Sequence, residues 1–211
     1  MKIFAYPWDL ADEGIDVTLA RFRSWGIDSV AVAVHYHSAK LFLPHNPRRK
    51  VYFPEAGRLY CPIEPGRFRH SAIQTDNSVW SREHPSFWDD LAEAAVKHGI
   101  AVTAWTVGLH GTAIGSRYPQ FAVRNAFGDP YPFSLCPSHD EARRYLALAV
   151  DAWSETGIFR DFFLESYQFM DFEHGFHHEM TGAPLTDRAK SLLSLCFCDA
   201  CMAGALRRGI D

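Results

Sequence analysis

The sequence predicts an α/β fold of the (β/α)8 TIM-barrel type, with about the first four βα units present. Three stretches share one plan, in which the end of a helix is followed by Gly-Ile and then by an apolar, partly β-branched run. Their glycines, Gly26, Gly99 and Gly157, stand where a helix C-terminus favours a left-handed residue. The runs are apolar on both faces, which is typical of buried parallel strands. Strands that alternate with helices in this way indicate parallel βα units.

The elements follow in order along the chain. Strands are expected at about residues 2–7, 29–36, 101–107 and 160–166. Helical periodicity predicts three helices, with inward faces formed by Ile15, Leu19 and Phe22, by Phe87, Leu91 and Ala95, and by Tyr145, Leu148 and Ala152. The third helix also carries the pattern of a capping box, with Ser138 as the N-cap and Glu141 three residues later.

The number of these units predicts only part of a barrel. A (β/α)8 barrel needs eight strands and typically about 250 residues, whereas this chain has 211 residues and about four strands. It finishes in "ALRRGID", which resembles another helix–Gly–Ile junction. We therefore expect residues 1–211 to be one partial domain, the N-terminal half of a barrel. A small, complete, open α/β sheet is the alternative.

Two long loops would lie at the catalytic end of such a barrel. Residues 38–85 and 108–136 follow the second and third strands, and the first of these loops is rich in Pro, Arg and aromatic residues. Loops of this length are usually functional or disordered, and the aromatic content argues against disorder. We expect the loops to wall a site at the C-terminal ends of the strands.

Composition narrows the class of protein. The formal net charge is −4 without a long run of one sign, so nothing indicates nucleic-acid binding. No signal core or membrane-length apolar run is present, and we expect a cytoplasmic protein that does not bind membranes. The sequence leaves homo-oligomerisation open. Aromatic residues make up 14% of the chain and there are 11 histidines, a composition that suits both a carbohydrate site and a core.

Three cysteines, Cys196, Cys198 and Cys201, form a C-x-C-x-x-C pattern. Disulfides between such close neighbours are strained and are rare in the cytoplasm, whereas thiolates at this spacing can converge on one zinc ion. A tetrahedral site needs a fourth ligand, for which Cys136 and Cys61 are candidates. Buried free thiols are the alternative interpretation. A closed site with four cysteines would be structural.

The segment "SLCFCDACMAGALRRGID" resembles the cysteine segment of the family 42 glycoside hydrolases, the β-galactosidase family of the retaining-glycosidase barrel clan, and "LCPSHDEARRY" resembles the stretch with its earlier cysteine. The resemblance is specific over roughly residues 120–211, and related uncharacterised glycosidase-like barrels share these features. It implies that Cys136, Cys196, Cys198 and Cys201 are the zinc ligands.

The same resemblance implies a role for Glu165 as general acid/base, because in the clan this residue is a Glu at the end of the fourth strand. Surrounding Phe162, Phe163, Leu164 and Tyr167 would favour a protonated carboxyl, as a general acid requires. The clan usually has Asn before this Glu, and here Leu164 stands in its place. Its nucleophile comes from the seventh strand, so we expect that residue in a missing C-terminal half.

Other side chains at the ends of strands are candidates for binding a carbohydrate substrate, since aromatic rings stack on sugars and imidazoles bond hydroxyls. The candidates are Trp8, His35, Tyr36, His37, Trp105, His110 and Tyr167. A packed aromatic core is the alternative for each of them.

Two rival functions remain open. His35-x-His37 at a strand end resembles the metal pair of metal-dependent amidohydrolases, and a second cluster (His174, His177, His178 and Glu179) has ligand-type side chains. The other rival is a non-catalytic, zinc-braced carbohydrate-binding fragment.

Overall fold

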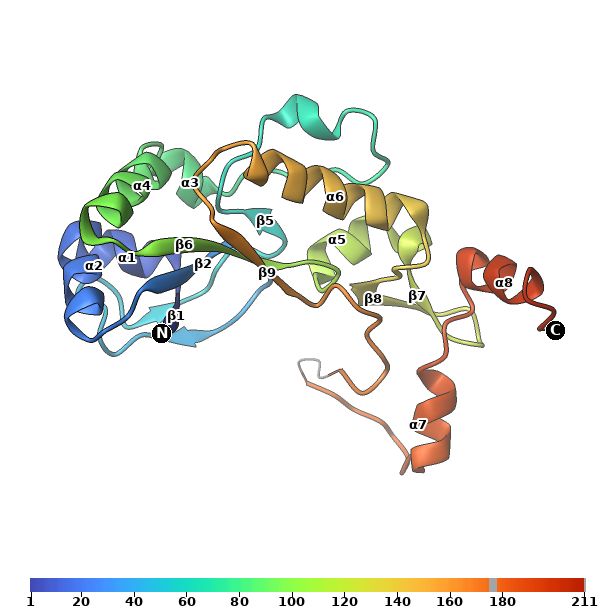
Figure 1. Ribbon diagram of the computed structural model, residues 1–211. Helices are drawn as coiled ribbons and strands as arrows, with labels where there is room; N and C mark the ends of the chain where they lie inside the picture. The colour runs from blue at the N-terminus through green and yellow to red at the C-terminus, as the bar shows by residue number, and fades with distance from the viewer. Residues whose placement is uncertain (175–177, 211) are drawn as a thin grey trace.

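The computed structural model describes residues 1–174 and 178–210. Its central sheet has four parallel strands in the order β1 (Lys2–Ala5), β2 (Ser29–Tyr36), β6 (Ala101–Val107) and β9 (Asp161–Glu165) (Figure 1). This confirms the four expected strands and their parallel pairing. In the described residues β1 and β9 are the edges of this sheet, and the strands do not close into a barrel.

The three expected helices are also present, as α2 (Ile15–Ser24), α4 (Phe87–His98) and α6 (Asp140–Ser154). Figure 1 shows α4 and α6 on the same side of the sheet. Gly26, Gly99 and Gly157 have φ angles of 77°, 61° and 70°, so each adopts the left-handed conformation that the sequence predicts. The turn at each glycine directs the chain from the helix into the next strand.

The start of the chain differs from the expectation. The first strand was expected to extend to about residue 7, but it ends at Ala5 and Pro7 begins the helix α1 (Pro7–Glu13). Proline stands at the first position of this helix, where its fixed φ fits and its missing N–H costs nothing. Trp8 consequently lies on a helix, with no exposed surface.

The predicted capping box of the third helix is wrong. The helix begins at Asp140 with His139 as the N-cap, and His139 makes no side-chain cap hydrogen bond. The Glu141 carboxylate instead accepts a hydrogen bond from the backbone N–H of Ala72 at 2.8 Å. A tertiary contact with the long loop therefore replaces the local one. The buried stripe of α6 is formed by Ala142, Tyr145, Leu146, Ala149 and Trp153, while Leu148 and Ala152 are only partly buried.

The two long loops contain short elements. The first holds β3 (Leu41–Phe42), β4 (Val51–Tyr52), β5 (Arg58–Leu59), η1 (Pro65–Phe68) and α3 (Val79–Glu83). The second holds α5 (Thr112–Arg117), η2 (Pro119–Phe121), β7 (Ala122–Arg124) and β8 (Pro130–Leu135). β3 pairs with β4, β7 pairs with β8, and β5 pairs with the C-terminal end of β2. The pairing of β5 with β2 attaches the first loop to the end of that strand.

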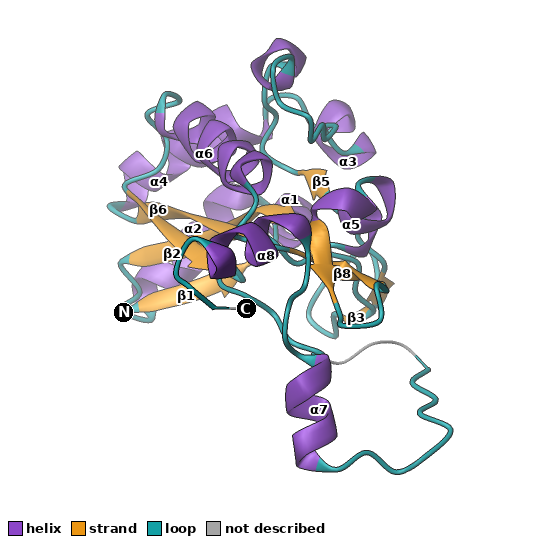
Figure 2. Cartoon of the chain, turned by 90° about the vertical axis from the view of Figure 1, so that its right-hand side faces the viewer, coloured by secondary structure: helices purple, strands orange, loops and turns teal. Residues whose placement is uncertain are grey.

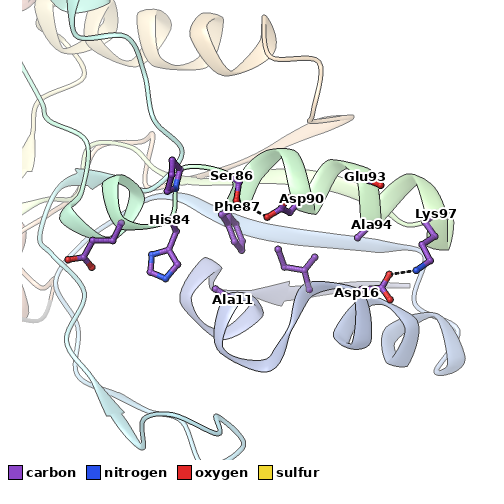
Figure 3. A pocket seen from close by; sticks show the side chains of 12 residues that line it. Ala11, Asp16, His84, Ser86, Phe87, Asp90, Glu93, Ala94 and Lys97 are labelled. Atoms are coloured by element: carbon purple, nitrogen blue, oxygen red, sulfur yellow. Dashed lines mark hydrogen bonds and ion pairs between the residues drawn. The ribbon is translucent and has the colours of Figure 1, made fainter.

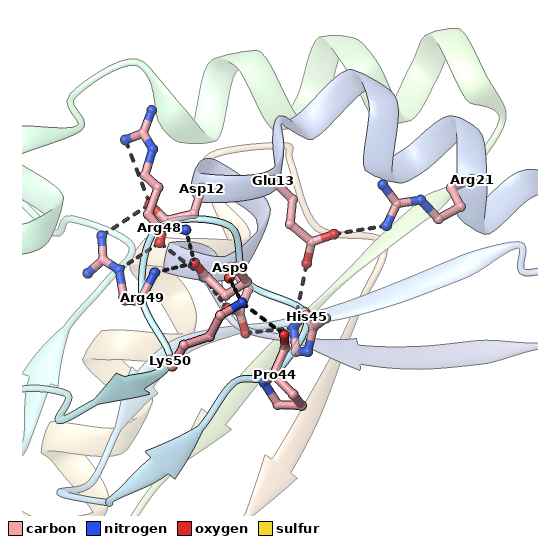
Figure 4. Close-up of polar contacts among 10 residues, drawn as sticks. Asp9, Asp12, Glu13, Arg21, Pro44, His45, Arg48, Arg49 and Lys50 are labelled. Atoms are coloured by element: carbon pink, nitrogen blue, oxygen red, sulfur yellow. Dashed lines mark hydrogen bonds and ion pairs between the residues drawn. The ribbon is translucent and has the colours of Figure 1, made fainter.

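A buried polar network holds the first loop against α1 (Figure 4). The Asn46 amide donates to Asp9 Oδ1 at 2.6 Å and to Asp12 Oδ2 at 3.0 Å, and its oxygen accepts from the backbone N–H groups of Arg48 and Arg49 at 2.9 Å. The Arg49 guanidinium pairs with the buried Asp12 carboxylate at 2.6 Å. Burial raises the pKa of Asp9. The network fixes the loop conformation through one fully buried amide.

Two further helices follow β9, namely α7 (Asp187–Leu193) and α8 (Asp199–Leu206). Neither has a buried residue, and α7 projects away from the sheet in both views (Figures 1 and 2). No helix among the described residues is both long and apolar enough to cross a membrane.

Candidate functional site

The central sheet has one face without a helical layer, which we call the open face. Register places Phe4, Trp105, Phe163 and Glu165 on it, because paired residues of parallel strands point to the same side. The Phe4 and Phe163 rings contact each other at 5.0 Å between centroids and are 46% and 42% exposed. The open face therefore presents aromatic surface in the region that leads up to Glu165.

A β-bulge in β2 determines which side chains reach this face. Ala33 pairs with Trp105, but His35 rather than Val34 pairs with Thr106, so Val34 is an extra residue in β2. Because of this extra residue, each later residue of β2 faces the side of the sheet opposite to the one that regular alternation would give it. Tyr36 consequently points to the open face.

His35 consequently points toward the helices. Its Nδ1 lies 2.5 Å from the Val107 carbonyl oxygen, and its Nε2 lies 3.4 Å from the hydroxyl of Tyr145 on α6. The imidazole is 2% exposed, and burial lowers its pKa to about 4. His35 therefore forms a neutral, hydrogen-bonded link between the sheet and α6.

Glu165 lies at the C-terminal end of β9, and the indole Nε1 of Trp105 donates a hydrogen bond to its Oε2 at 2.6 Å. The carboxylate is half-buried. The apolar enclosure expected from its neighbours is incomplete in the described residues, because Phe163 and Leu164 are 42% and 50% exposed. The ring of Trp105, from the neighbouring strand, instead forms an aromatic wall beside the carboxylate. The indole contact orients the carboxylate toward the open face.

Two tyrosines complete this wall. The hydroxyls of Tyr6 and Tyr36 are 3.0 Å apart, and both rings contact Trp105, at 5.4 and 5.2 Å between centroids. Burial raises the pKa of both phenols, so both stay protonated and can donate hydrogen bonds. Tyr6, just after β1, alternates with Phe4 and so belongs to the same face.

Three imidazoles continue the wall along the loops. The His37 ring stacks on Tyr36 at 4.5 Å and on His110 at 4.6 Å between centroids, and His110 Nε2 lies 3.3 Å from His174 Nε2. Burial, with smaller effects of His37 and His174, lowers the pKa of His110 to about 4. A neutral imidazole both donates and accepts hydrogen bonds, which suits sugar hydroxyls.

The backbone after β9 is held against the loop after β6. The Gly108 N–H donates to the Glu165 carbonyl at 2.8 Å, and the Leu109 N–H donates to the Ser166 carbonyl at 2.8 Å. Ser166 has a φ of 56°, an uncommon conformation for a residue other than glycine. The strained turn directly follows Glu165, and such strain often marks a functional position.

The remaining candidates lie elsewhere. Trp8 is fully buried behind the ring of Tyr6, to which it stacks at 4.8 Å. The Tyr167 hydroxyl lies 2.6 Å from that of Thr106, which points to the helix-covered side. The structure thus groups Tyr36, His37, Trp105 and His110 with Glu165, and places Trp8, His35 and Tyr167 in the packed interior.

The second cluster consists of Cys136, Cys196, Cys198 and Cys201, whose sulfur atoms all lie within 4.8 Å of one another. Cys136 Sγ lies 3.5 Å from Cys201 Sγ and 3.8 Å from Cys196 Sγ. A disulfide would place two sulfurs about 2.05 Å apart, and all four thiols are free. The cluster can therefore hold a metal ion. Cys61, the other sequence candidate, is buried apart from it, and burial raises the pKa of its thiol.

The cysteine cluster ties the C-terminal segment to the second loop. Cys136 follows β8, whereas the other three cysteines lie at the start of α8 and just before it. The Phe197 N–H donates to the Arg124 carbonyl at 2.7 Å, and the Arg124 N–H lies 3.5 Å from Cys196 Sγ. Thiol hydrogen bonds lower the pKa of Cys196, because its thiolate accepts them. Since α8 has no buried residue, this cluster is its main attachment.

The geometry does not favour the amidohydrolase alternative. His35 Nδ1 is bonded to the Val107 carbonyl, whereas His37, just beyond the end of β2, stacks on Tyr36 and His110. Within residues 1–174 and 178–210, the four cysteines are the only group of three or more metal-type ligands. His177, from the second predicted cluster, lies outside the described residues.

A separate cleft of about 560 Å³ lies between α1 and α2 on one side and α3 and α4 on the other (Figure 3). The Lys97 ammonium and the Asp16 carboxylate form an ion pair of 2.7 Å at one end of the cleft (Figure 3). None of its lining residues belongs to the sheet, and only Glu83, His84 and Pro85 come from the first long loop. It forms part of the outer helical layer and not of the candidate site.

Comparisons with known proteins agree with this fold. No family model and no curated protein sequence matches the chain. A solved structure of a hypothetical protein from Ruminiclostridium thermocellum is similar, with a TM-score of 0.56, 14% identity, and coverage of 99% of this chain and 94% of that one. α-L-Fucosidase isoenzyme 2 from Paenibacillus thiaminolyticus has a TM-score of 0.51 and 14% identity over 93% of this chain and 23% of its own.

A maltogenic α-amylase, AmyB from Thermotoga neapolitana, has a TM-score of 0.48 and 14% identity over 77% of this chain and 38% of its own. At such low identity these likenesses concern the fold. The likenesses to the hypothetical protein and to the fucosidase show an α/β fold, and the matched part is 23% of the fucosidase chain.

Proposed function

We propose that this chain belongs to a glycoside hydrolase and that Glu165 is its general acid/base. One observation carries the proposal. A half-buried carboxylate at the end of a parallel strand accepts a hydrogen bond from Trp105 and faces an aromatic wall that a ligand can reach. The fold shared with part of an α-L-fucosidase supports the same conclusion. Glu165 would protonate the glycosidic oxygen as the bond breaks and then activate water.

The retaining route needs a second carboxylate about 5–5.5 Å from the first. In the clan that this chain resembles, the nucleophile comes from the seventh strand of a barrel, and the four strands here correspond to the first four. We propose that further βα units supply it and cover the open face. The exposed aromatic rings of Phe4 and Phe163 support this proposal, because the inward-facing side chains of a complete barrel form a packed core.

We further propose that the cysteine cluster binds structural zinc. Four sulfurs at about 2.3 Å from a tetrahedral zinc ion lie about 3.8 Å apart. The two sulfur separations from Cys136, 3.5 and 3.8 Å, fit this spacing. Zinc with four thiolates has no open position for catalysis, so its role would be to hold α8 against the hairpin of β7 and β8.

The test uses a panel of 4-nitrophenyl glycosides with the intact polypeptide. Glu165→Gln should lower kcat by about 10²–10⁴-fold on the hydrolysed substrate. Asp161→Asn, at the opposite end of the same strand, is the matched control and should retain turnover. Added azide should restore release of 4-nitrophenol in Glu165→Ala and yield a glycosyl azide, because azide needs no general base.

Two outcomes would contradict the proposal. Full activity in Glu165→Gln would exclude the acid/base role. Saccharide binding without turnover in the wild type, unchanged in Glu165→Gln, would instead identify a non-catalytic carbohydrate-binding protein.

A further inference from the structure

A pocket of about 660 Å³ lies beside the candidate site, between β8, the segment after β9 and α7. Its aromatic lining comes from Tyr131, Phe133 and Phe172, and the Tyr131 and Phe133 rings lie nearly parallel, with 5.6 Å between centroids. Glu173 and Lys190 form a 2.8 Å ion pair on its polar side. A mostly apolar concave surface with a few polar groups is the usual form of a small-molecule site.

His174 connects this pocket to the candidate site. It lines the pocket, its ring lies 5.6 Å from that of Phe133, and its Nε2 lies 3.3 Å from His110 Nε2. From His110 the ring contacts continue through His37 and Tyr36. They end at Trp105, which holds Glu165. An unbroken series of rings thus leads from the carboxylate to the pocket.

The lining indicates the kind of ligand. Aromatic rings match the apolar C–H faces of a pyranose, and the carboxylate, ammonium and imidazole groups can bond its hydroxyls. The pocket has two carboxylates, Glu173 and Glu179, against one ammonium group, Lys190. This balance disfavours anionic sugars such as uronates.

We propose that the pocket is a second saccharide subsite beside the candidate site at Glu165 and that the substrate is a neutral oligosaccharide, not a short glycoside. This inference rests on the proposed function of Glu165. The ring series then provides the surface along which the sugar chain runs from the reacting bond to the pocket.

The experiment measures binding of neutral gluco-, galacto- and manno-oligosaccharides of one to five units by titration calorimetry. The intact polypeptide is compared with Phe172→Ala and with Phe169→Ala, a matched control on the same segment. Phe169 is 39% exposed and does not line the pocket. The wild type and Phe169→Ala should bind a tetrasaccharide about tenfold more tightly than a disaccharide, the gain expected from covering one further aromatic surface.

Phe172→Ala should lose this gain and keep the wild-type affinity for the disaccharide. Lys190→Gln, a change on the surface of α7, should reduce the same gain. This second variant provides an independent test if Phe172→Ala does not fold. Affinity that does not increase with length in the wild type overturns the subsite. So does an unchanged length dependence in both pocket variants, or tighter binding of an aryl monosaccharide than of every oligosaccharide. Failure to bind any saccharide would count against the proposed function itself.

Discussion

The buried imidazole of His35 makes the stability of this protein sensitive to acid. Burial lowers its pKa from 6.5 to about 4, a difference of 2.5 units. A lowered histidine pKa means that the folded state binds fewer protons than the unfolded state between these two values. The stability is therefore complete above pH 6.5 and decreases as the pH falls toward 4. At 1.36 kcal/mol per unit the full loss is about 3 kcal/mol, of which about 2 kcal/mol is lost by pH 5.

Urea unfolding at pH 7, 6 and 5 measures this loss as a change in the free energy of unfolding. His35→Gln removes the titrating group and keeps an amide donor near the Val107 carbonyl. Its free energy of unfolding should therefore fall by about 2 kcal/mol less than that of the wild type between pH 7 and 5. The comparison leaves the cysteines unchanged, so their protonation affects both proteins alike. His70→Gln, which changes an exposed imidazole, should retain the wild-type pH dependence.

Equal pH dependence in the wild type and His35→Gln would refute the reasoning. It would mean that the imidazole is accessible to protons in the folded protein. The burial of this ring between the sheet and α6 would then not hold in solution.

Three further predictions follow from contacts that can be removed singly. Cys198→Ser should lower the zinc content measured by atomic absorption from one equivalent toward zero, whereas Cys61→Ser, also buried, should leave it unchanged. Asn46→Ala should destabilise the protein by about 3 kcal/mol in urea unfolding, since it removes one hydrogen-bond partner from each of the buried Asp9 and Asp12 carboxylates and from two backbone N–H groups; a loss below 1 kcal/mol would contradict this account. Gly115→Ala should lower the thermal midpoint, because the added Cβ would lie 1.9 Å from the Pro132 carbonyl oxygen, and an unchanged midpoint would show that α5 and β8 are not packed this closely.

Much of the sheet could be predicted because its signals are local. A glycine after each helix and a run of apolar residues beyond it specify where a helix stops and a buried strand starts, whatever the rest of the chain does. The four parallel strands follow from three such junctions and the opening segment. The cysteine cluster was predictable for a related reason, since three of its members lie within six residues of one another in the sequence.

Other features depended on contacts between distant residues. The cap of α6 is a clear example, because Glu141 bonds the backbone of Ala72 in a loop far away in the sequence. The helix α1 is another, because the sequence analysis predicted no helix there and the buried network around Asn46, which holds α1 against the loop, joins residues far apart in the chain.

The candidate site shows the same division. The sequence by itself determined that Glu165 ends a strand and that aromatic and histidine residues end its neighbours. Only the tertiary structure decided that Tyr36 and not His35 faces the carboxylate side, and that His174 joins His110. The physical reason is that one extra residue, Val34, reverses the alternation of side chains in β2. That extra residue is defined by the pairing between β2 and β6, whose partners lie about 70 residues apart in the sequence. A local sequence pattern therefore does not predict it.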